Sequence, residues 1–413
     1  MKGEYIEFTK DMIKDYTILI PTMLPIHFKL VTRVLSNYGY KTEILDTSGK
    51  QVVDTGLKYV HNDTCYPAIL VIGQLINALQ SGKYNINKIA LMLFQTGGGC
   101  RASNYISLLR KALKKAGLGH IPVISFGIAG IEKHSGMKLT APRLIKMIQG
   151  VLYGDLLMSL VNQVKPYEKN KGEAVALSEK WMHSLEIELA RLHISKRKVL
   201  ENYRQIIKEF GEIPYEKKDK IKVGIVGEIF VKYSPLGNNN LEEFLYNEGA
   251  EVVVPGLLDF LLYCIYNPIL DAKLYGINKG ISYAYKAVLN VLLKKQQQII
   301  DAINAHGRFM PPTPFMTTVS LVKGYIGIGT KMGEGWLLTA EMLELAHQGV
   351  ENIICTQPFG CLPNHICGKG MMKPIKEKNK NVNIVAIDYD AGATQVNQEN
   401  RIKLMLANAI EKQ

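Results

Sequence analysis

The sequence lacks the motifs by which common nucleotide-binding and nucleic-acid-binding proteins are recognised. Three glycines at 97–99 suggest a phosphate loop, but neither G-x-G-x-x-G nor G-x-x-x-x-G-K-[ST] occurs there, which disfavours nucleotide phosphates. The formal charge of +13 comes without a recognisable nucleic-acid-binding module or a long basic tail. We therefore expect a solvated basic surface. An acidic protein or a phosphate-bearing substrate is the alternative partner, and nucleic acid is not expected to bind.

Long apolar runs and a signal peptide are also lacking. The most apolar window, 252–270, is interrupted by Pro255, Asp259 and Pro268, so it is a poor candidate for a membrane span. The first residues contain no apolar segment followed by a cleavage site. We expect a cytoplasmic protein, in which the six cysteines are thiols or ligands rather than disulfides.

Apolar stretches of strand length alternate with segments of helical periodicity along much of the chain. This alternation predicts an α/β protein with two doubly wound, mostly parallel sheets that face each other across a shared site. We expect a first α/β domain at 1–138, a helical connector at 139–215 and a second α/β domain at 216–413. The expected strands are YTILIPTM, KTEILDT, IALMLF, IPVISF, IKVGIVG, AEVVVPG, ENIIC and NIVAIDYD.

Half of the cysteines lie in the stretch CTQPFGCLPNHIC, which places Cys355, Cys361 and Cys367 at a repeated C-x5-C spacing. The stretch begins where the strand ENII ends, and strand ends are where parallel sheets usually hold functional groups. Two further cysteines, Cys65 and Cys100, lie on similar turns between strand and helix. Soft thiolates favour zinc and iron-sulfur centres, so the five cysteines are candidates for one metal or cluster site.

The residues around Cys65 and Cys100 suggest how the charge and hydrogen bonding of such a site would be set. Cys65 precedes a helix that Pro67 is suited to begin, so we expect the helix dipole to favour its thiolate. Next to Cys100, Gly98 and Gly99 would let backbone amides approach the sulfurs of a cluster, and Arg101 would add a positive charge. These three residues are the candidate cofactor-binding residues.

Other candidates have simpler explanations. Cys264 lies in an apolar helical context, so burial is favoured over ligation. Glu228 follows a strand, where a tight turn explains the local sequence equally well. Asp388 and Asp390 end a strand and are either ligands, acids or caps of the next helix. A structural zinc site formed by Cys355, Cys361, Cys367 and His365 remains an alternative, although its spacing is wider than in common zinc sites.

The sequence resembles the 2-hydroxyacyl-CoA dehydratase superfamily, and most closely the dehydratase-like portion of large acyl-CoA dehydratase activase-related proteins. The resemblance rests on HNDTCYPAILVIGQ, QTGGGCRASNY, KVGIVGEIF, GEGWLL, QPFGCLPNHICGKG and AIDYDAGATQVNQENRIKL. These stretches lie between His61 and Leu404. The chain lacks the ATPase modules of the large relatives.

The resemblance implies a 4Fe-4S cluster or a double-cubane cluster of the 8Fe type. It implies Cys65, Cys100 and Cys355 as the foremost ligands, followed by Cys361 and Cys367. Six cysteines would also match two cubanes of three thiolates each, with Cys264 as the sixth ligand. The resemblance further implies electrons from a separate ATP-hydrolysing iron-sulfur activator.

The predicted function is low-potential reduction or dehydratase-like chemistry at the cluster, on a small-molecule or acyl-CoA substrate. The sequence contains no CoA-binding signature of its own, and we name no catalytic side chain. A non-catalytic electron-transfer or cluster-carrier protein is the alternative. We expect either a homo-oligomer or a pair with a homologous subunit.

Overall fold

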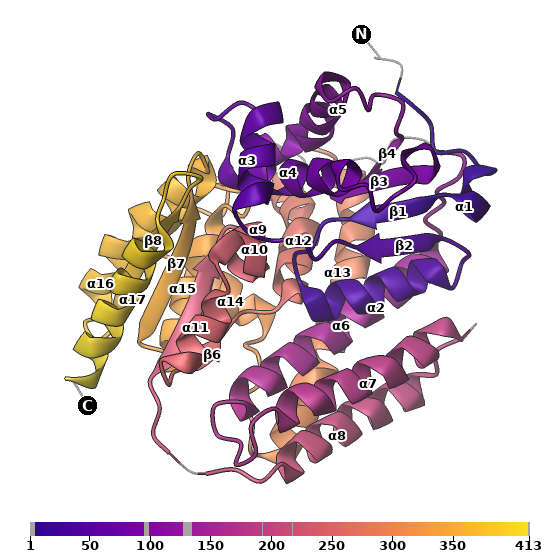
Figure 1. Cartoon of the computed structure of the whole chain (residues 1–413). Helices are drawn as coiled ribbons and strands as arrows, with labels where there is room; N and C mark the ends of the chain where they lie inside the picture. The colour runs from indigo at the N-terminus through magenta and orange to yellow at the C-terminus, as the bar shows by residue number, and fades with distance from the viewer. Residues whose placement is uncertain (1–4, 95–98, 127–133, 192, 217, 412–413) are drawn as a thin grey trace.

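The computed structural model describes residues 5–94, 99–126, 134–191, 193–216 and 218–411. The amino-terminal half contains one sheet with helices on its faces (Figure 1). Its elements are α1 (Met12–Asp15), β1 (Thr17–Ile20), α2 (Pro25–Ser36), β2 (Lys41–Ile44), α3 (Lys50–Tyr59), α4 (Tyr66–Gln80), η1 (Ile86–Lys88), β3 (Ile89–Phe94), η2 (Arg101–Asn104), α5 (Tyr105–Lys115) and β4 (Val123–Phe126).

Three long helices follow, and a second sheet completes the chain. The helices are α6 (Ala141–Val164), α7 (Glu173–Ala190) and α8 (Lys196–Glu212). The elements of the carboxy-terminal half are β5 (Lys222–Gly227), α9 (Ile229–Tyr233), α10 (Pro235–Asn238), α11 (Leu241–Asn247), β6 (Glu251–Val253), α12 (Leu257–Tyr275), α13 (Lys279–His306), α14 (Phe315–Leu321), α15 (Trp336–His347), β7 (Asn352–Pro358), η3 (Asn364–Gly368), η4 (Lys369–Met371), α16 (Met372–Lys378), β8 (Asn383–Tyr389) and α17 (Gln395–Ile410).

The two sheets have the same strand order. The first runs β2-β1-β3-β4 and the second β6-β5-β7-β8, with every pairing parallel. In each sheet the chain moves outward from the first strand to one side and then returns to build the other side. The switch points are therefore β1/β3 and β5/β7, beyond whose carboxyl ends an open α/β sheet forms a crevice. The predicted α/β fold with two doubly wound parallel sheets is confirmed.

Helix α6 packs against elements of both halves. It contacts α2 of the first half and α12 and β6 of the second. Among the described helices, it is the one long and apolar enough to span a membrane, and 67% of that apolar window is buried inside the protein. A helix that is apolar all round and buried is typical of a protein core. The most apolar window of the sequence, 252–270, instead contains the last two residues of β6 and most of α12.

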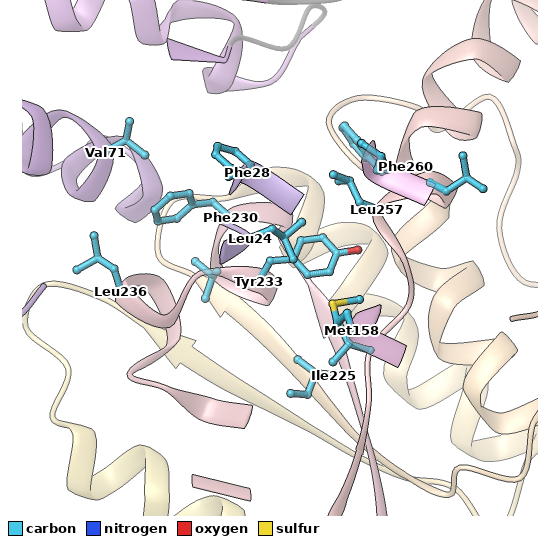
Figure 2. Packing of buried hydrophobic residues seen from close by; sticks show 14 of the residues in the cluster. Leu24, Phe28, Val71, Met158, Ile225, Phe230, Tyr233, Leu236, Leu257 and Phe260 are labelled. Carbon is cyan, nitrogen blue, oxygen red and sulfur yellow. The ribbon is translucent and has the colours of Figure 1, made fainter. Parts of the chain in front are cut away.

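Apolar side chains from both halves and from α6 form a continuous core at their junction. Figure 2 shows Phe28 of α2, Val71 of α4 and Met158 of α6 among residues of β5, α9, α10 and α12. All three side chains are at most 8% exposed. The halves therefore share one hydrophobic core instead of folding around separate ones.

A polar link crosses the same junction. Asp155 of α6 accepts a hydrogen bond from Nε2 of His27 at 2.7 Å. It also accepts the backbone N–H groups of Leu257 and Leu258, at 2.7 and 2.9 Å, in the first turn of α12. The carboxylate thus satisfies unpaired donors at a helix amino terminus while it contacts the first half.

Candidate functional site

Three side chains that form the candidate site follow the carboxyl ends of central strands. Cys100 follows β3, Glu228 follows β5, and Cys361 follows β7. In the second sheet, β5 and β7 are neighbours at the switch point, so Glu228 and Cys361 leave adjacent strand ends. The arrangement comes from parallel strands whose apolar residues are almost wholly buried and whose connections emerge on one edge.

Cys65 is the amino-terminal cap residue of α4, as the sequence predicted, but the expected turn between strand and helix is wrong here, because the segment that carries Cys65 follows helix α3. Its thiol is 5% exposed and lies 3.2 Å from the hydroxyl of Tyr105. The expectation that the helix dipole favours the thiolate is corrected, because burial raises the pKa of Cys65 above its usual value. Hydrogen bonds from Tyr105 and from the backbone of Ala68 oppose this effect without reversing it.

Cys100 is less buried than Cys65 and Cys361, and it lies where the two halves of the chain meet. Burial raises its pKa to about 11, and the charges of Glu334, Glu228 and Cys65 act in the same direction. Immediately before it, the backbone N–H of Gly99 contacts Sδ of Met332 from the second half at 3.0 Å. The candidate Gly98 lies outside the described residues.

Cys361 belongs to the same group of thiols. It is 6% exposed, and burial raises its pKa far above its usual value. The charges of Glu334, Glu228 and Cys100 raise it further. The charge of Glu228 therefore raises the pKa of all three thiols, Cys65, Cys100 and Cys361. The first two belong to the first half of the chain and Cys361 to the second.

Two glycines allow the halves to approach at this point. A Cβ added at Gly360 would lie 3.2 Å from Cα of Cys65, and one at Gly333 would lie 3.6 Å from Sγ of Cys100 and 2.9 Å from Cγ of Pro363. Both glycines have positive φ, at +76° and +59°. A side chain at either position would be strained and would separate the loops that carry the thiols.

Glu228 and Glu334 form the acidic part of the site. Glu228 caps α9 by accepting the N–H of Val231 at 2.8 Å, and Glu334 accepts the N–H of Ile229 at 3.0 Å. Burial, and then the charge of Glu334, raises the pKa of Glu228 to about 8, and burial also raises that of Glu334. Glu228 is therefore inclined to hold a proton near neutral pH, and the pKa of Glu334 is shifted in the same direction.

From the sequence alone, Glu228 was only a weak candidate for a functional residue, and Glu334 was not a candidate. The available signal was the GEGW turn, in which both glycines adopt positive φ and fix Glu334 between them. That strained turn directs a charged residue into the protein interior, where it is 8% exposed.

Cys355 lies in a different environment from the three thiols. It is a central residue of β7 and fully buried, with Sγ 3.4 Å from Oδ1 of Asn364. A Cβ added at Gly368 would lie 3.1 Å from this sulfur. After burial, the charges that act on Cys355 are those of Glu341, Asp388 and Lys369.

Cys264 of α12 and Cys367 of η3 are the two remaining cysteines. Both thiols are influenced by the charge of Glu334, and both act on the hydroxyl of Tyr263. Burial raises their pKa values to about 12 and about 11, respectively. Cys367 is buried, whereas Cys264 is partly exposed.

The remaining sequence candidates lie around this centre. The guanidinium of Arg101 donates to the carbonyl of Asp63 and lies 3.6 Å from a Cβ placed on Gly360. His365 is exposed and bonds to the buried amide of Gln357.

Asp388 forms ion pairs with Lys369 and Arg401, both at 3.5 Å. Asp390 bonds to the backbone N–H of Ala391. The alternative that these aspartates cap the next helix is wrong, because the cap residue of α17 is Thr394.

The donor set at this junction consists mainly of thiols, the soft ligands that zinc and iron-sulfur centres share. In the described part of the chain, no group of three or more His, Cys, Asp and Glu side chains is placed to hold one metal ion. A cubane is wider than an ion, so its thiolate ligands lie farther apart. Burial favours the neutral thiols, and a cationic iron core would supply the charge that stabilises thiolates there.

A cavity of about 380 Å³ opens between the first half, α6 and the second half. Its lining includes His27, Asn162, Lys165, Glu242 and Tyr246, but none of the cysteines. The carboxyl of Glu242 accepts a hydrogen bond from Asn162 at 3.1 Å, and burial raises its pKa. This cavity is therefore separate from the thiol site.

Comparison with known proteins adds no further assignment. No family model matches the chain, and no curated protein matches it.

Proposed function

We propose that the protein is an iron-sulfur protein of the 2-hydroxyacyl-CoA dehydratase type. It would perform low-potential reduction or dehydratase-like chemistry at a 4Fe-4S or double-cubane cluster, with electrons from a separate ATP-dependent activator. The observation that carries the proposal is the close approach of Cys65 and Cys100, from the first half, to the loops of the second half that carry Cys361 and Glu334: a Cβ on Gly360 would lie 3.2 Å from Cα of Cys65, and one on Gly333 would lie 3.6 Å from Sγ of Cys100.

Within this proposal, Cys65, Cys100 and Cys361 are the foremost ligands of one cubane. This set replaces Cys355, the third ligand implied by the resemblance, with Cys361, because Gly360 beside Cys361 packs against Cys65, whereas Sγ of Cys355 is buried within β7 against Asn364 and Gly368. Cys264 and Cys367 are the candidates for additional ligands of a double cluster.

The chain's own groups would prepare the site in three ways. Gly333 and Gly360 let the loops close over the thiols, and the shared apolar core excludes water. Glu228 and Glu334, if protonated, can hold a proton beside the site without adding negative charge. When bound, a cubane would supply low-potential electron transfer and, with three thiolates, one iron open to substrate.

The test is chemical analysis of protein purified without oxygen. We expect at least about four irons per chain with matching acid-labile sulfide, and an electron paramagnetic resonance signal after chemical reduction. Colourless protein that takes up one zinc and no sulfide after anaerobic reconstitution would exclude the cluster and favour the zinc alternative.

A non-catalytic electron carrier is the second candidate. It is favoured by the position of the 380 Å³ cavity, which none of the cysteines lines. The two functions differ in their response to substrate. A 2-hydroxyacyl-CoA that changes the resonance signal of the reduced protein supports the enzyme, and an unchanged signal at saturating concentration supports the carrier.

A further inference from the structure

Helix α13 exposes a second apolar face beside the one that it buries. Its buried face includes Leu289, Leu292 and Ile303. A separate row begins just before the helix and continues along its first half, at intervals of four, three, four and three residues. This row, the α13 stripe, consists of Ile277, Ile281, Ala284, Val288 and Val291. From Ile281 to Val291 the spacing places these residues on one side of the helix, as in a coiled-coil seam, and Ile277 lies in the turn just before it.

The side chains of the α13 stripe are open to solvent. Ile277, Ile281 and Val291 are 50%, 57% and 55% exposed, and Val288 is 46% exposed. Nearby on the same segment, Leu274, Tyr275 and Tyr283 are 46%, 57% and 71% exposed. Isolated exposed apolar residues are common, but a contiguous apolar row marks an interaction site.

The charged residues of the segment that carries the α13 stripe have one sign. From Ala272 to Ile300 the chain contains five lysines and neither aspartate nor glutamate. Lys273, Lys279, Lys286 and Lys294 are exposed, whereas Lys295 is partly buried and bonds to Gln149. Asp271, just before this segment, is paired with Lys331.

This charge pattern selects among the possible occupants. If two copies of the chain docked through the α13 stripe, lysines would face lysines with no acid from this segment between them, and like charges disfavour such a contact. A surface with acidic residues beside an apolar row would instead gain both apolar burial and charge complementarity.

We propose that the α13 stripe is the docking surface for a different protein, one that presents a row of apolar side chains flanked by aspartate and glutamate. The surface adjoins the segment that carries Glu334. The hydroxyl of Tyr263 donates to the carbonyl of Lys331 at 2.7 Å, and Tyr275 lies against Gly329. Tyr275 ends α12 and precedes the α13 stripe by two residues, so a partner on the stripe would reach the end of α12 that lies against Gly329.

Two synthetic helical peptides test the proposal with the full chain. Both carry leucine at every a and d position of a heptad repeat; one has glutamate at the flanking positions and the other has lysine. Fluorescence anisotropy should show that the glutamate peptide binds, with an affinity that falls as salt is raised, and that the lysine peptide does not.

Variants assign the binding to this surface. The pair Ile281→Glu and Val288→Glu should weaken the glutamate peptide by about tenfold or more. The matched control, Leu404→Glu on α17, replaces a side chain that is 63% exposed and should leave binding unchanged. Charge reversal at two positions, by Lys286→Glu together with Lys294→Glu, should make the chain prefer the lysine peptide. Circular dichroism would check that each variant is folded.

Three results would overturn the proposal. These are failure of the glutamate peptide to bind, equal binding of the two peptides, and equal loss of binding in the control variant. Sedimentation velocity provides a further decision: a stable dimer of the unmodified chain that Ile281→Glu with Val288→Glu converts to monomers would show that a second copy occupies the surface.

Discussion

The backbone N–H of Tyr66 donates a hydrogen bond to the carbonyl of Phe359 at 3.1 Å. Tyr66 follows Cys65 in the first half, and Phe359 precedes Cys361 by two residues in the second. This bond fixes the backbone of one candidate ligand against that of another. The geometry of the thiol site and the contact between the halves therefore depend on each other.

This dependence predicts that cluster loading protects the Tyr66 amide. Binding to the folded form adds stabilising free energy, and the opening that exposes this amide would have to separate two ligands. Hydrogen exchange of the Tyr66 amide should be slower in iron-loaded protein than in iron-free protein, whereas amides in α8 should change little. Equal exchange at Tyr66 in the two forms would show that no shared cluster joins the halves.

Alanine variants should separate ligands from packed cysteines. Cys100→Ala and Cys361→Ala should each deplete the same cluster, as judged by iron per chain after anaerobic reconstitution. Cys355→Ala should retain iron and lose roughly 1–2 kcal/mol of unfolding free energy, because it removes a small buried group. Iron loss from Cys355→Ala equal to that from Cys361→Ala would restore Cys355 to the ligand set.

Cys264→Ala addresses the size of the cluster. With a single cubane on Cys65, Cys100 and Cys361, this variant should keep its full iron content. Loss of a fixed fraction of the iron would instead identify Cys264 as a ligand of a double cluster. Urea unfolding would show whether any iron loss arises from instability of the variant.

Replacement of one partner in the buried pair Lys232–Glu341 should be strongly destabilising. The two groups lie 2.7 Å apart and are 3% and 2% exposed. Glu341→Gln would leave the lysine charge buried without its counter-ion, at a cost of about 3–5 kcal/mol. The double variant Lys232→Met with Glu341→Leu should recover most of this loss in urea unfolding. A double variant as unstable as the single one would contradict this account.

Glu344 should make stability depend on pH. Burial, and then the charge of Glu341, raises its pKa to about 7. Between the ordinary value of 4.5 and about 7, the folded state binds more protons at this group than the unfolded state does, so its contribution to stability falls as pH rises. Glu344→Gln should flatten the decline in unfolding free energy between about pH 5 and pH 8 by up to about 3 kcal/mol. An equal decline in the variant would exclude Glu344 as its source.

Gly154 should be required by its contact with His27. A Cβ at Gly154 would lie 2.5 Å from Cδ2 of the buried imidazole. Gly154→Ala should therefore lower the thermal midpoint and cost about 1–3 kcal/mol, although alanine is the better helix former. In the background His27→Ala, the same substitution should lose most of its cost. A penalty of equal size in both backgrounds would place the strain elsewhere.

The sequence alone determined the order of strands and helices, because the main strands carry apolar runs that can be buried on both faces of a parallel sheet. It also placed Cys100 after a strand and Cys65 before a helix, although the element that precedes Cys65 is a helix and not the expected strand. Pro67, two residues after Cys65, acts through local backbone geometry at the start of α4, which is readable without tertiary contacts.

Only the tertiary structure decided which side chains share a site. Cys355 and Cys361 are six residues apart, yet the first is buried in the core of the second half, whereas the second is influenced by the charge of Cys100 from the first half. The role of Glu334 depends on β5 and α9, which lie about a hundred residues earlier in the chain. The burial of a residue and the charges near it depend on segments that are distant in sequence. No local pattern could therefore predict the raised pKa of Cys65 or which residues lie together at the junction.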